Sequence, residues 1–402
     1  MREKKLSYSE KLKQHIQKLQ EEVQKIQEEG KRKKMINFKA LSSTWDEYFV
    51  LHKLILYCEY LSNQTFINST QLPFQLENDK LMCAVLETLK KTDFDNPLIK
   101  AYWIIKQLYE NIAIESVKAQ ALIQQVLEIG QTSVKLFSAE ESTLLYSCLT
   151  NFCTRKINQG ESIFRKTLLM IYQEMLHVQY EQYHKKNKKI PPGVFKNMVS
   201  NALKISDAQY FKNLQTKGLI PYSETGYKDV WEWIEKFIAH YQQFLSKKGK
   251  ETYLPYCQAL VAYQSEQINE AYQKLHLLKN KRGMFIPFNI KVLYLKVLFD
   301  ISVKESNPKI RYDIEFDKAL DSYKSLIKDE KRKEQLSDYH VVHHKKLNNL
   351  FYSLKQFYQK YETIGYKDDK IKFEAAKEKL IKKLEDFAHD KSWFLERIES
   401  IK

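Results

Sequence analysis

Glycine and proline are scarce in this chain of 402 residues, where they occur nine and eight times. Turn-rich β proteins and phosphate-binding α/β enzymes need both residue types at many loops. Long helices joined by short connections need few of them. The scarcity therefore predicts an all-α fold, and a hydrophobic content of 43% supplies apolar material for a sizeable core or for two or three domains.

Local capping signals also favour helices. Thr44 and Glu47 have the spacing at which a hydroxyl and a carboxylate each satisfy a free backbone N–H at a helix start. Asn96 precedes Pro97, so a capping amide comes before a proline at a first helical position. From these signals and the apolar periodicity we predict sixteen amphipathic helices at residues 40–63, 77–93, 97–113, 116–136, 139–158, 160–186, 192–204, 206–217, 228–247, 252–265, 267–280, 287–302, 313–328, 336–363, 369–388 and 390–400.

One segment, IKVLYLKVLFDISV at 290–303, is apolar enough to suggest a strand. Its polar residues Lys291, Lys296 and Asp300 are five and four positions apart. That spacing fits a mostly buried helix better than the alternation of a strand.

The first 36 residues predict a separate charged helix. Lys, Glu and Gln separate apolar residues that recur at heptad-like spacings, namely Leu12, Ile16, Leu19, Val23 and Ile26. The pattern ends near Gly30 and the basic run at 31–34. We expect this helix to pack on the body, to pack on a second copy or to extend into solvent, which gives two regions, 1–36 and 37–402.

The stretch AYQSEQINEAYQKLHLL at 262–278 predicts an antiparallel helical hairpin. Ala259 and Tyr263 lie one turn apart on its first helix, and Ala271 and Leu275 lie one turn apart on its second. Small residues at the crossing, each with a larger residue beside it, let two helices approach closely. The pattern predicts that these four residues pack the hairpin together.

This pattern resembles the tetratricopeptide (TPR) repeat, in which a small residue and Tyr on one helix are answered by Ala and a large apolar residue on the next. The pattern recurs at Ala319 and Tyr323. The recurrence is irregular, because Ala271 and Ala319 are 48 residues apart, whereas TPR units repeat about every 34 residues. The segments 47–64, 194–214 and 231–245 and the hairpin are also similar, in the same order, to uncharacterised bacterial helical-repeat proteins.

The resemblance implies a TPR-like α-solenoid of stacked antiparallel hairpins without assigned chemistry. In such arrays, first-helix positions line the concave surface, and the positions that match here are Tyr253, Tyr256 and Gln264. Exposed aromatics on a groove would recognise an extended or helical peptide. Packing of these rings in the core is the alternative.

Two Glu-x-x-His phrases, Glu174–His177 and Glu181–His184, suggest a di-iron carboxylate site. In di-iron bundles the two phrases come from facing helices. Here they share one predicted helix and lie about 10 Å apart along its axis. A polar helix face is therefore favoured over a metal site.

The remaining constellations do not define an enzyme. His340, His343 and His344 lack the carboxylate of a zinc protease motif, so we expect a solvated or capping role for them. The glycine at 160 begins GESIFRKT, in which Arg165 occupies the place of the second glycine of a phosphate loop. We therefore predict a protein that is not an enzyme and that has no cofactor, metal or catalytic residue.

Charge leaves a second function open. The net charge is +16, and residues 155–217 hold 12 basic and 4 acidic residues. Within them, the connector HKKNKKIPPG at 184–193 could meet phosphate or an acidic peptide, or could be a solvated loop. The basic side chains concerned are Lys185, Lys186, Lys188 and Lys189.

The cysteines and the lack of long apolar runs indicate in which cellular compartment the protein is expected. Five scattered cysteines without a Cys-x-x-Cys pair favour a reducing environment. Neither a signal peptide nor a membrane span is evident, since no run of about 18 apolar residues occurs. We expect a cytoplasmic scaffold or adaptor that binds another protein on a curved surface, the alternative being a nucleic-acid-associated module that uses residues 155–217. The oligomeric state is left open.

Overall fold

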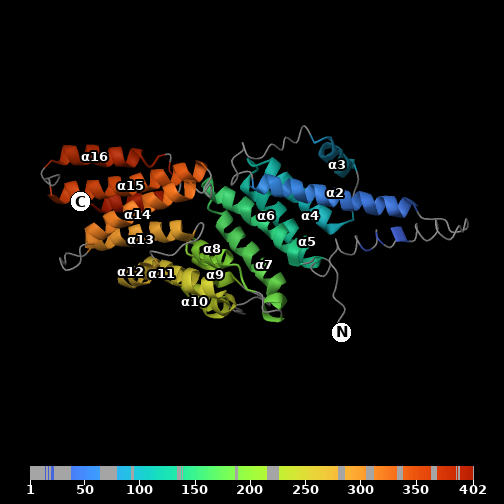
Figure 1. Ribbon diagram of the computed structural model, residues 1–402, viewed down its shortest axis with the longest axis horizontal. Coiled ribbons are helices and arrows are strands. Elements are labelled where there is room, and N and C mark those ends of the chain that lie inside the picture. Colours follow the sequence, from blue (N-terminus) through green and yellow to red (C-terminus); the bar gives the residue numbers. More distant parts are fainter. Residues whose placement is uncertain are drawn as a thin grey trace, which may run out of the picture. The chain divides into compact units, whose positions relative to one another are not determined.

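The computed structural model describes most of the chain beyond residue 37 (Figure 1). The described residues are 14, 17, 20, 21, 38–63, 79–91, 95–133, 137, 139–185, 189–214, 226–278, 286–304, 312–332, 338–363, 369–385, 387 and 390–401. The heptad-like helix predicted at 1–36 lies outside them apart from four positions.

The described residues form sixteen α-helices and no β-strand, which confirms the predicted all-α fold. In chain order the α-helices are α2 (Phe38–Asn63), α3 (Lys80–Lys91), α4 (Pro97–Glu110), α5 (Ser116–Thr132), α6 (Ala139–Asn158), α7 (Phe164–Lys185), α8 (Pro192–Ala202), α9 (Ala208–Asn213), α10 (Val230–Tyr241), α11 (Leu254–Gln264), α12 (Ile268–Leu278), α13 (Ile286–Lys304), α14 (Tyr312–Arg332), α15 (Asp338–Thr363), α16 (Lys370–Lys382) and α17 (Lys391–Ser400). A 3-10 turn, η2 (Gln242–Phe244), and a π-helical turn, η3 (Gly249–Tyr253), precede α11.

The chain divides into two compact units. Unit 1 comprises residues 1–157 and 161–186, and unit 2 comprises residues 158–160 and 187–402. The division falls inside the region predicted as one body, 37–402.

Unit 1 is built around α4, which packs on both α2 and α5, while α5 also packs on α7. The Tyr109 ring of α4 meets Phe152 of α6 edge-on, and Phe152 meets Phe164 of α7 in the same way. All three rings are buried. Edge-to-face contacts of this kind are a favourable arrangement for aromatic rings and help to hold α4, α6 and α7 together.

Helix starts in unit 1 show which capping signals operate. Asn96 accepts hydrogen bonds from the backbone N–H groups of Leu98 and Ile99, which confirms the predicted cap of α4. Thr44 was expected to open a helix, but α2 begins at Phe38, so that prediction is wrong and Thr44 lies inside the helix.

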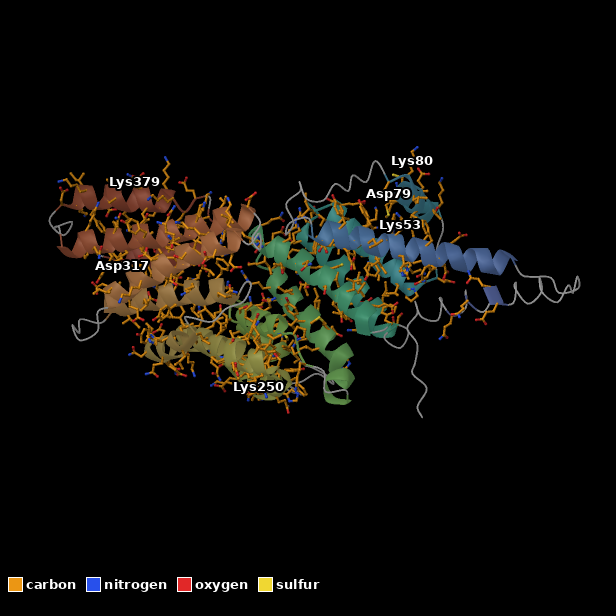
Figure 2. All side chains as sticks on the ribbon, viewed as in Figure 1. Lys53, Asp79, Lys80, Lys250, Asp317 and Lys379 are labelled. Atoms are coloured by element: carbon orange, nitrogen blue, oxygen red, sulfur yellow. The ribbon has the colours of Figure 1, made fainter. Side chains whose placement is uncertain are left out.

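Asp79 caps α3 and also ties it to α2. Its carboxylate accepts from the Met82 N–H at 2.9 Å and lies 3.0 Å from Lys53 Nζ (Figure 2). These contacts lower the pKa of Asp79, the backbone hydrogen bond from Met82 being the larger cause.

Unit 2 begins with an aromatic cluster and continues as a series of neighbouring helices. The cluster is formed by buried rings of α8, α9 and α10, in which Trp233 stacks on Phe237, and Phe195 and Phe211 contact these two rings at tilted angles. From α11 to α16, each helix packs on the one that follows. Contacts between neighbours in sequence therefore dominate this half of the unit.

The predicted hairpin is formed by α11 and α12, which residues 265–267 connect and which pack on each other. Ala259, Tyr263, Ala271 and Leu275 are all buried. Ala319 and Tyr323 of α14 are buried as well.

Gly226, which leads into α10, occupies a position that requires glycine. Its φ of +80° is one that other residues rarely adopt, and a Cβ there would lie 1.9 Å from the Lys212 carbonyl oxygen. The close approach lets the N–H of the next residue, Tyr227, donate to the Phe211 carbonyl at 3.0 Å. The glycine thus joins the start of α10 to the end of α9.

Candidate functional site

Helix α17 is short and buries one side. Trp393, Phe394 and Ile398 are buried, whereas Ser392 and Glu399 are exposed. Isolated helices shorter than about 12 residues are marginal in water, so α17 depends on packing for its stability. The surface that it covers is the strongest candidate for a functional site.

Aromatic side chains from two helices of unit 2 receive the buried side of α17. The Trp393 ring lies 5.9 Å from Phe299 of α13 and 5.6 Å from Phe351 of α15, measured between centroids. Phe394 lies 5.1 Å from the same Phe351. Aromatic pairs at such distances stabilise by about 0.5–1.5 kcal/mol each beyond the area they bury.

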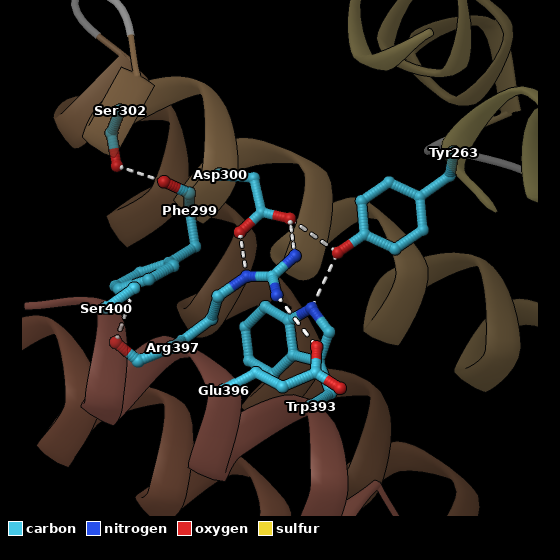
Figure 3. A network of polar contacts seen from close by, with 8 residues as sticks. All are labelled: Tyr263, Phe299, Asp300, Ser302, Trp393, Glu396, Arg397 and Ser400. Atoms are coloured by element: carbon cyan, nitrogen blue, oxygen red, sulfur yellow. Dashed lines mark hydrogen bonds and ion pairs between the residues drawn. The ribbon is translucent and has the colours of Figure 1, made fainter. Parts of the chain in front are cut away.

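Tyr263 of α11 adds a polar contact in this apolar setting (Figure 3). Its hydroxyl accepts from the Trp393 indole N–H at 2.6 Å and donates to Asp300 Oδ2 at 2.6 Å. Burial, and then the nearby charge of Asp300, raise the pKa of Tyr263. The hydroxyl therefore keeps its proton near neutral pH and can serve both partners.

Asp300 of α13 is the electrostatic centre of the contact. Its side chain is only 3% exposed and receives two hydrogen bonds from Arg397 of α17, Nε to Oδ1 at 2.7 Å and Nη2 to Oδ2 at 2.7 Å (Figure 3). The hydrogen bonds to Asp300 raise the pKa of Arg397. A two-pronged guanidinium–carboxylate pair is both strong and selective in orientation, because the two planar groups must align.

A second ion pair fixes the start of α17. Asp390 Oδ1 lies 2.8 Å from Lys296 Nζ of α13, and that ammonium also lies 5.2 Å from the centroid of the Trp393 ring. Asp390 has a left-handed backbone with φ of 59° and makes no side-chain capping bond to α17. Its carboxylate is committed to α13 instead of to its own helix.

Side chains of α11, α13 and α15 thus contact one side of α17. We call this surface the α17-binding face, and it comprises Tyr263, Lys296, Phe299, Asp300 and Phe351. It has an apolar centre, a buried carboxylate and an ammonium group. Such a surface can hold an amphipathic helix that supplies aromatic, basic and acidic side chains at matching positions.

A separate polar cluster lies between α12, α13 and α14. Glu315 accepts from the Tyr272 hydroxyl at 2.8 Å and from the Tyr294 hydroxyl, and His276 Nδ1 lies 3.1 Å from the Tyr294 oxygen. Burial is the main cause of the raised pKa of Tyr294. The cluster joins three successive helices and serves their packing.

The predicted groove residues are not brought together as a site. Tyr256 is 7% exposed, so the prediction that it presents its ring to a partner is wrong and its ring belongs to the core. Tyr253 is half-buried in η3, and Gln264 is exposed at the end of α11. Tyr263 of α11 contacts both α13 and α17, whereas the sequence had predicted only a role in packing the hairpin.

The basic region 155–217 is divided between the two units. Lys185 ends α7, Lys189 is exposed, and the side chains of Lys185, Lys186 and Lys188 lie outside the described residues. Lys156 is 2% exposed and donates to Glu161 Oε1 at 2.8 Å and to the Ile114 carbonyl at 3.1 Å.

Two of the three α15 histidines, His343 and His344, are half-buried and contact aromatic rings, which differs from the solvated or capping role expected of them. His344 stacks on Phe288 with centroids 4.3 Å apart and lies 2.7 Å from the Tyr323 hydroxyl through Nδ1. His343 stacks on Phe387 at 5.0 Å. These rings pack against aromatic neighbours because an imidazole offers a flat face together with a polar edge.

No group of three or more His, Cys, Asp and Glu side chains in the described part of the chain is arranged to hold a metal ion. The first Glu-x-x-His phrase lies on α7, where His177 is exposed and Glu174 is half-buried. The side chains of Glu181 and His184 lie outside the described residues.

The chain is therefore an all-α protein, and its second unit holds α17, one of its own helices, on an aromatic and charged face. No protein-family model, curated protein sequence or solved structure matches the chain. Among the helices that the structure describes, none has the length and apolar character needed to cross a membrane.

Proposed function

We propose that this chain is a non-catalytic scaffold or adaptor of the cytoplasm, and that it captures another protein through a helix or peptide bound to unit 2. In this proposal α11–α16 form a TPR-like stack of hairpins with an irregular repeat. Two observations favour such a stack, the successive packing of these helices and the buried small residues of the α11–α12 hairpin.

The observation that carries the proposal is the way in which α17 is held. Alternate helices of a hairpin stack line the same surface, and α11, α13 and α15 all contribute side chains to the contact with α17. Recognition of an amphipathic helix in a groove uses this combination of apolar anchors and flanking charges. A surface that holds one helix of the chain has the chemistry to hold a helix of a partner.

Affinity purification from the native host at near-physiological salt tests the proposal. Three tagged full-length baits are compared, the unchanged chain, Asp300→Asn in the α17-binding face, and Glu399→Ala on the exposed side of α17 as the matched control. We expect the unchanged bait and Glu399→Ala to recover the same partner reproducibly, and Asp300→Asn to alter its yield. Recovery of the chain alone with all three baits would refute a scaffold function.

A further inference from the structure

Helix α17 fills the face that a partner would need. We propose that α17 is an internal ligand of the α17-binding face, and that the partner of this chain is an amphipathic helix with the side-chain chemistry of α17, which takes its place. This inference rests on the proposed scaffold function and adds to it the class of partner and the means by which binding is restrained.

The contacts of α17 are those of a ligand helix. It is ten residues long and has no side-chain cap at its start, where Asp390 adopts a left-handed backbone. Its polar contacts to α11 and α13 are side-chain contacts through Asp390, Trp393 and Arg397. Helices α11–α16 pack on one another in succession, and α17 in turn packs on α16. Release of α17 would therefore uncover the face and leave the packing between α11 and α16 in place.

The same contacts specify the competing helix. An indole N–H must reach the Tyr263 hydroxyl, and a guanidinium one turn later must reach Asp300, as Trp393 and Arg397 do. A second aromatic ring beside the indole would meet Phe351, and an acidic residue before the helix would meet Lys296. The partner helix should therefore carry an acidic residue just before its start, then a Trp-Phe pair, and an Arg four residues after the Trp. Lysine in place of the Arg would lose the two-pronged contact.

A labelled synthetic peptide of residues 389–402 is the probe. Its fluorescence anisotropy is measured against the full-length chain, the full-length Arg397→Gln variant and the full-length Glu399→Ala variant. Arg397→Gln loosens the internal α17 but leaves the face itself unchanged. Because a hydrogen-bonded charged contact contributes about a tenfold or larger change in affinity, we expect Arg397→Gln to bind the peptide roughly 10-fold more tightly than the unchanged chain. Glu399→Ala should bind like the unchanged chain.

Specificity is checked by changing the peptide and the face together. A peptide carrying glutamine in place of its arginine should bind the Arg397→Gln chain roughly 10-fold more weakly than the unmodified peptide. On a full-length chain carrying both Arg397→Gln and Asp300→Asn, the two peptides should bind alike. This pattern would assign the gain in binding to the contact with Asp300.

Equal affinity of the peptide for all three chains, or no binding to Arg397→Gln, would overturn the inference. Far-UV circular dichroism checks that each variant keeps its helix content. If Arg397→Gln loses helix content, the Trp393→Phe variant replaces it, since this change removes the indole N–H contact to Tyr263 and leaves a smaller aromatic ring against Phe299 and Phe351. Trp393→Phe should then bind the peptide more tightly than the unchanged chain does. Equal affinity for these two chains would overturn the inference.

Affinity purification separates this inference from the proposed function. A partner recovered equally by the unchanged chain, Arg397→Gln and Asp300→Asn would leave a scaffold function in place and would overturn the role of α17. Failure to recover any partner would refute the scaffold function, whereas tight peptide binding by Arg397→Gln would still show that the face accepts a helix.

Discussion

The hydroxyl of Tyr263 connects helices that are far apart in the sequence. It joins Trp393 of α17 to Asp300 of α13, and its own ring belongs to α11. A buried polar group left without its partner costs about 1–3 kcal/mol, so the contribution of this single oxygen should be measurable.

Replacement of Tyr263 by phenylalanine tests this residue. The change leaves the Trp393 N–H without its acceptor and removes one hydrogen bond to Asp300. We expect the free energy of unfolding, measured by urea denaturation, to fall by about 1–3 kcal/mol. Tyr352→Phe on α15 is the matched control, because that side chain is 53% exposed and its loss should change stability by less than about 0.5 kcal/mol. Equal effects of the two variants would contradict the assigned role of the Tyr263 hydroxyl.

Glu161 provides a test of pH dependence in unit 1. Hydrogen bonds from Lys156, and then from Ser116, hold the pKa of Glu161 below its ordinary value of 4.5. A carboxyl whose pKa is lower in the folded state stabilises that state fully above its ordinary pKa, and this contribution disappears as pH falls through the lowered value.

Glu161→Gln should therefore destabilise the chain at pH 7 and have progressively less effect below pH 4.5. Thermal unfolding of both chains between pH 7 and pH 3 measures the difference. Glu115→Gln is a suitable control, because that carboxylate is exposed and its ion pair is with the exposed Lys118, three residues along the chain. If the melting temperatures of Glu161→Gln and the unchanged chain differed by the same amount at every pH in this range, the stabilising role of the Glu161 carboxylate would be contradicted.

At the scale of elements, the junction of α9 and α10 depends on the left-handed glycine at 226. Gly226→Ala would bring a Cβ against the Lys212 carbonyl and strain the backbone. We expect a loss of about 1–3 kcal/mol or more in unfolding free energy by urea denaturation. Gly193→Ala is the control, since a Cβ at Gly193 meets nothing within 4 Å and should not destabilise the chain. Similar stability of the two variants would show that the junction tolerates a side chain.

Helix existence could be predicted from sequence because its signals are local. Each of the sixteen predicted helices has a counterpart, and the Asn96 cap was assigned correctly. The predicted boundaries differ more from the structure, since the helix predicted at 206–217 is the shorter α9, Ala208–Asn213. The capping-box spacing at Thr44 predicted a helix start at the wrong residue, because a local pattern does not show whether helical structure precedes it. Helix α2 starts earlier, at Phe38.

The candidate site could be predicted only in part because its contacts are distant in sequence. Asp300 was visible as a polar residue on an apolar helix, but its partner Arg397 is 97 residues away and carries no local signal. Tyr256 was misassigned because α11 is packed on several sides, by α8, α12 and α13, so its periodicity does not define one exposed face. Burial on a helix surrounded by neighbours depends on their positions, which a single sequence does not contain.

At the scale of the whole molecule, the net charge of +16 makes nucleic-acid binding the alternative to be tested. Part of the basic region is committed internally, since Lys156 is buried and paired, and burial lowers the pKa of Lys196. We expect no saturable binding of duplex DNA or RNA at about 150 mM salt in a filter-binding or anisotropy titration. Tight binding that weakens steeply with added salt would instead support phosphate contacts and the nucleic-acid alternative.

The central claim is that unit 2 holds a helix through specific contacts, and the coupling between Asp300 and Arg397 tests it most directly. A double-mutant cycle compares the unchanged chain, Asp300→Asn, Arg397→Gln and the double variant by urea denaturation. We predict a coupling of about 1.5–3 kcal/mol, because Asp300 is buried and Arg397→Gln leaves its charge with the Tyr263 hydroxyl as the remaining hydrogen-bond donor described above. Effects that add to within about 0.5 kcal/mol would contradict the claim that Asp300 holds α17 on this face.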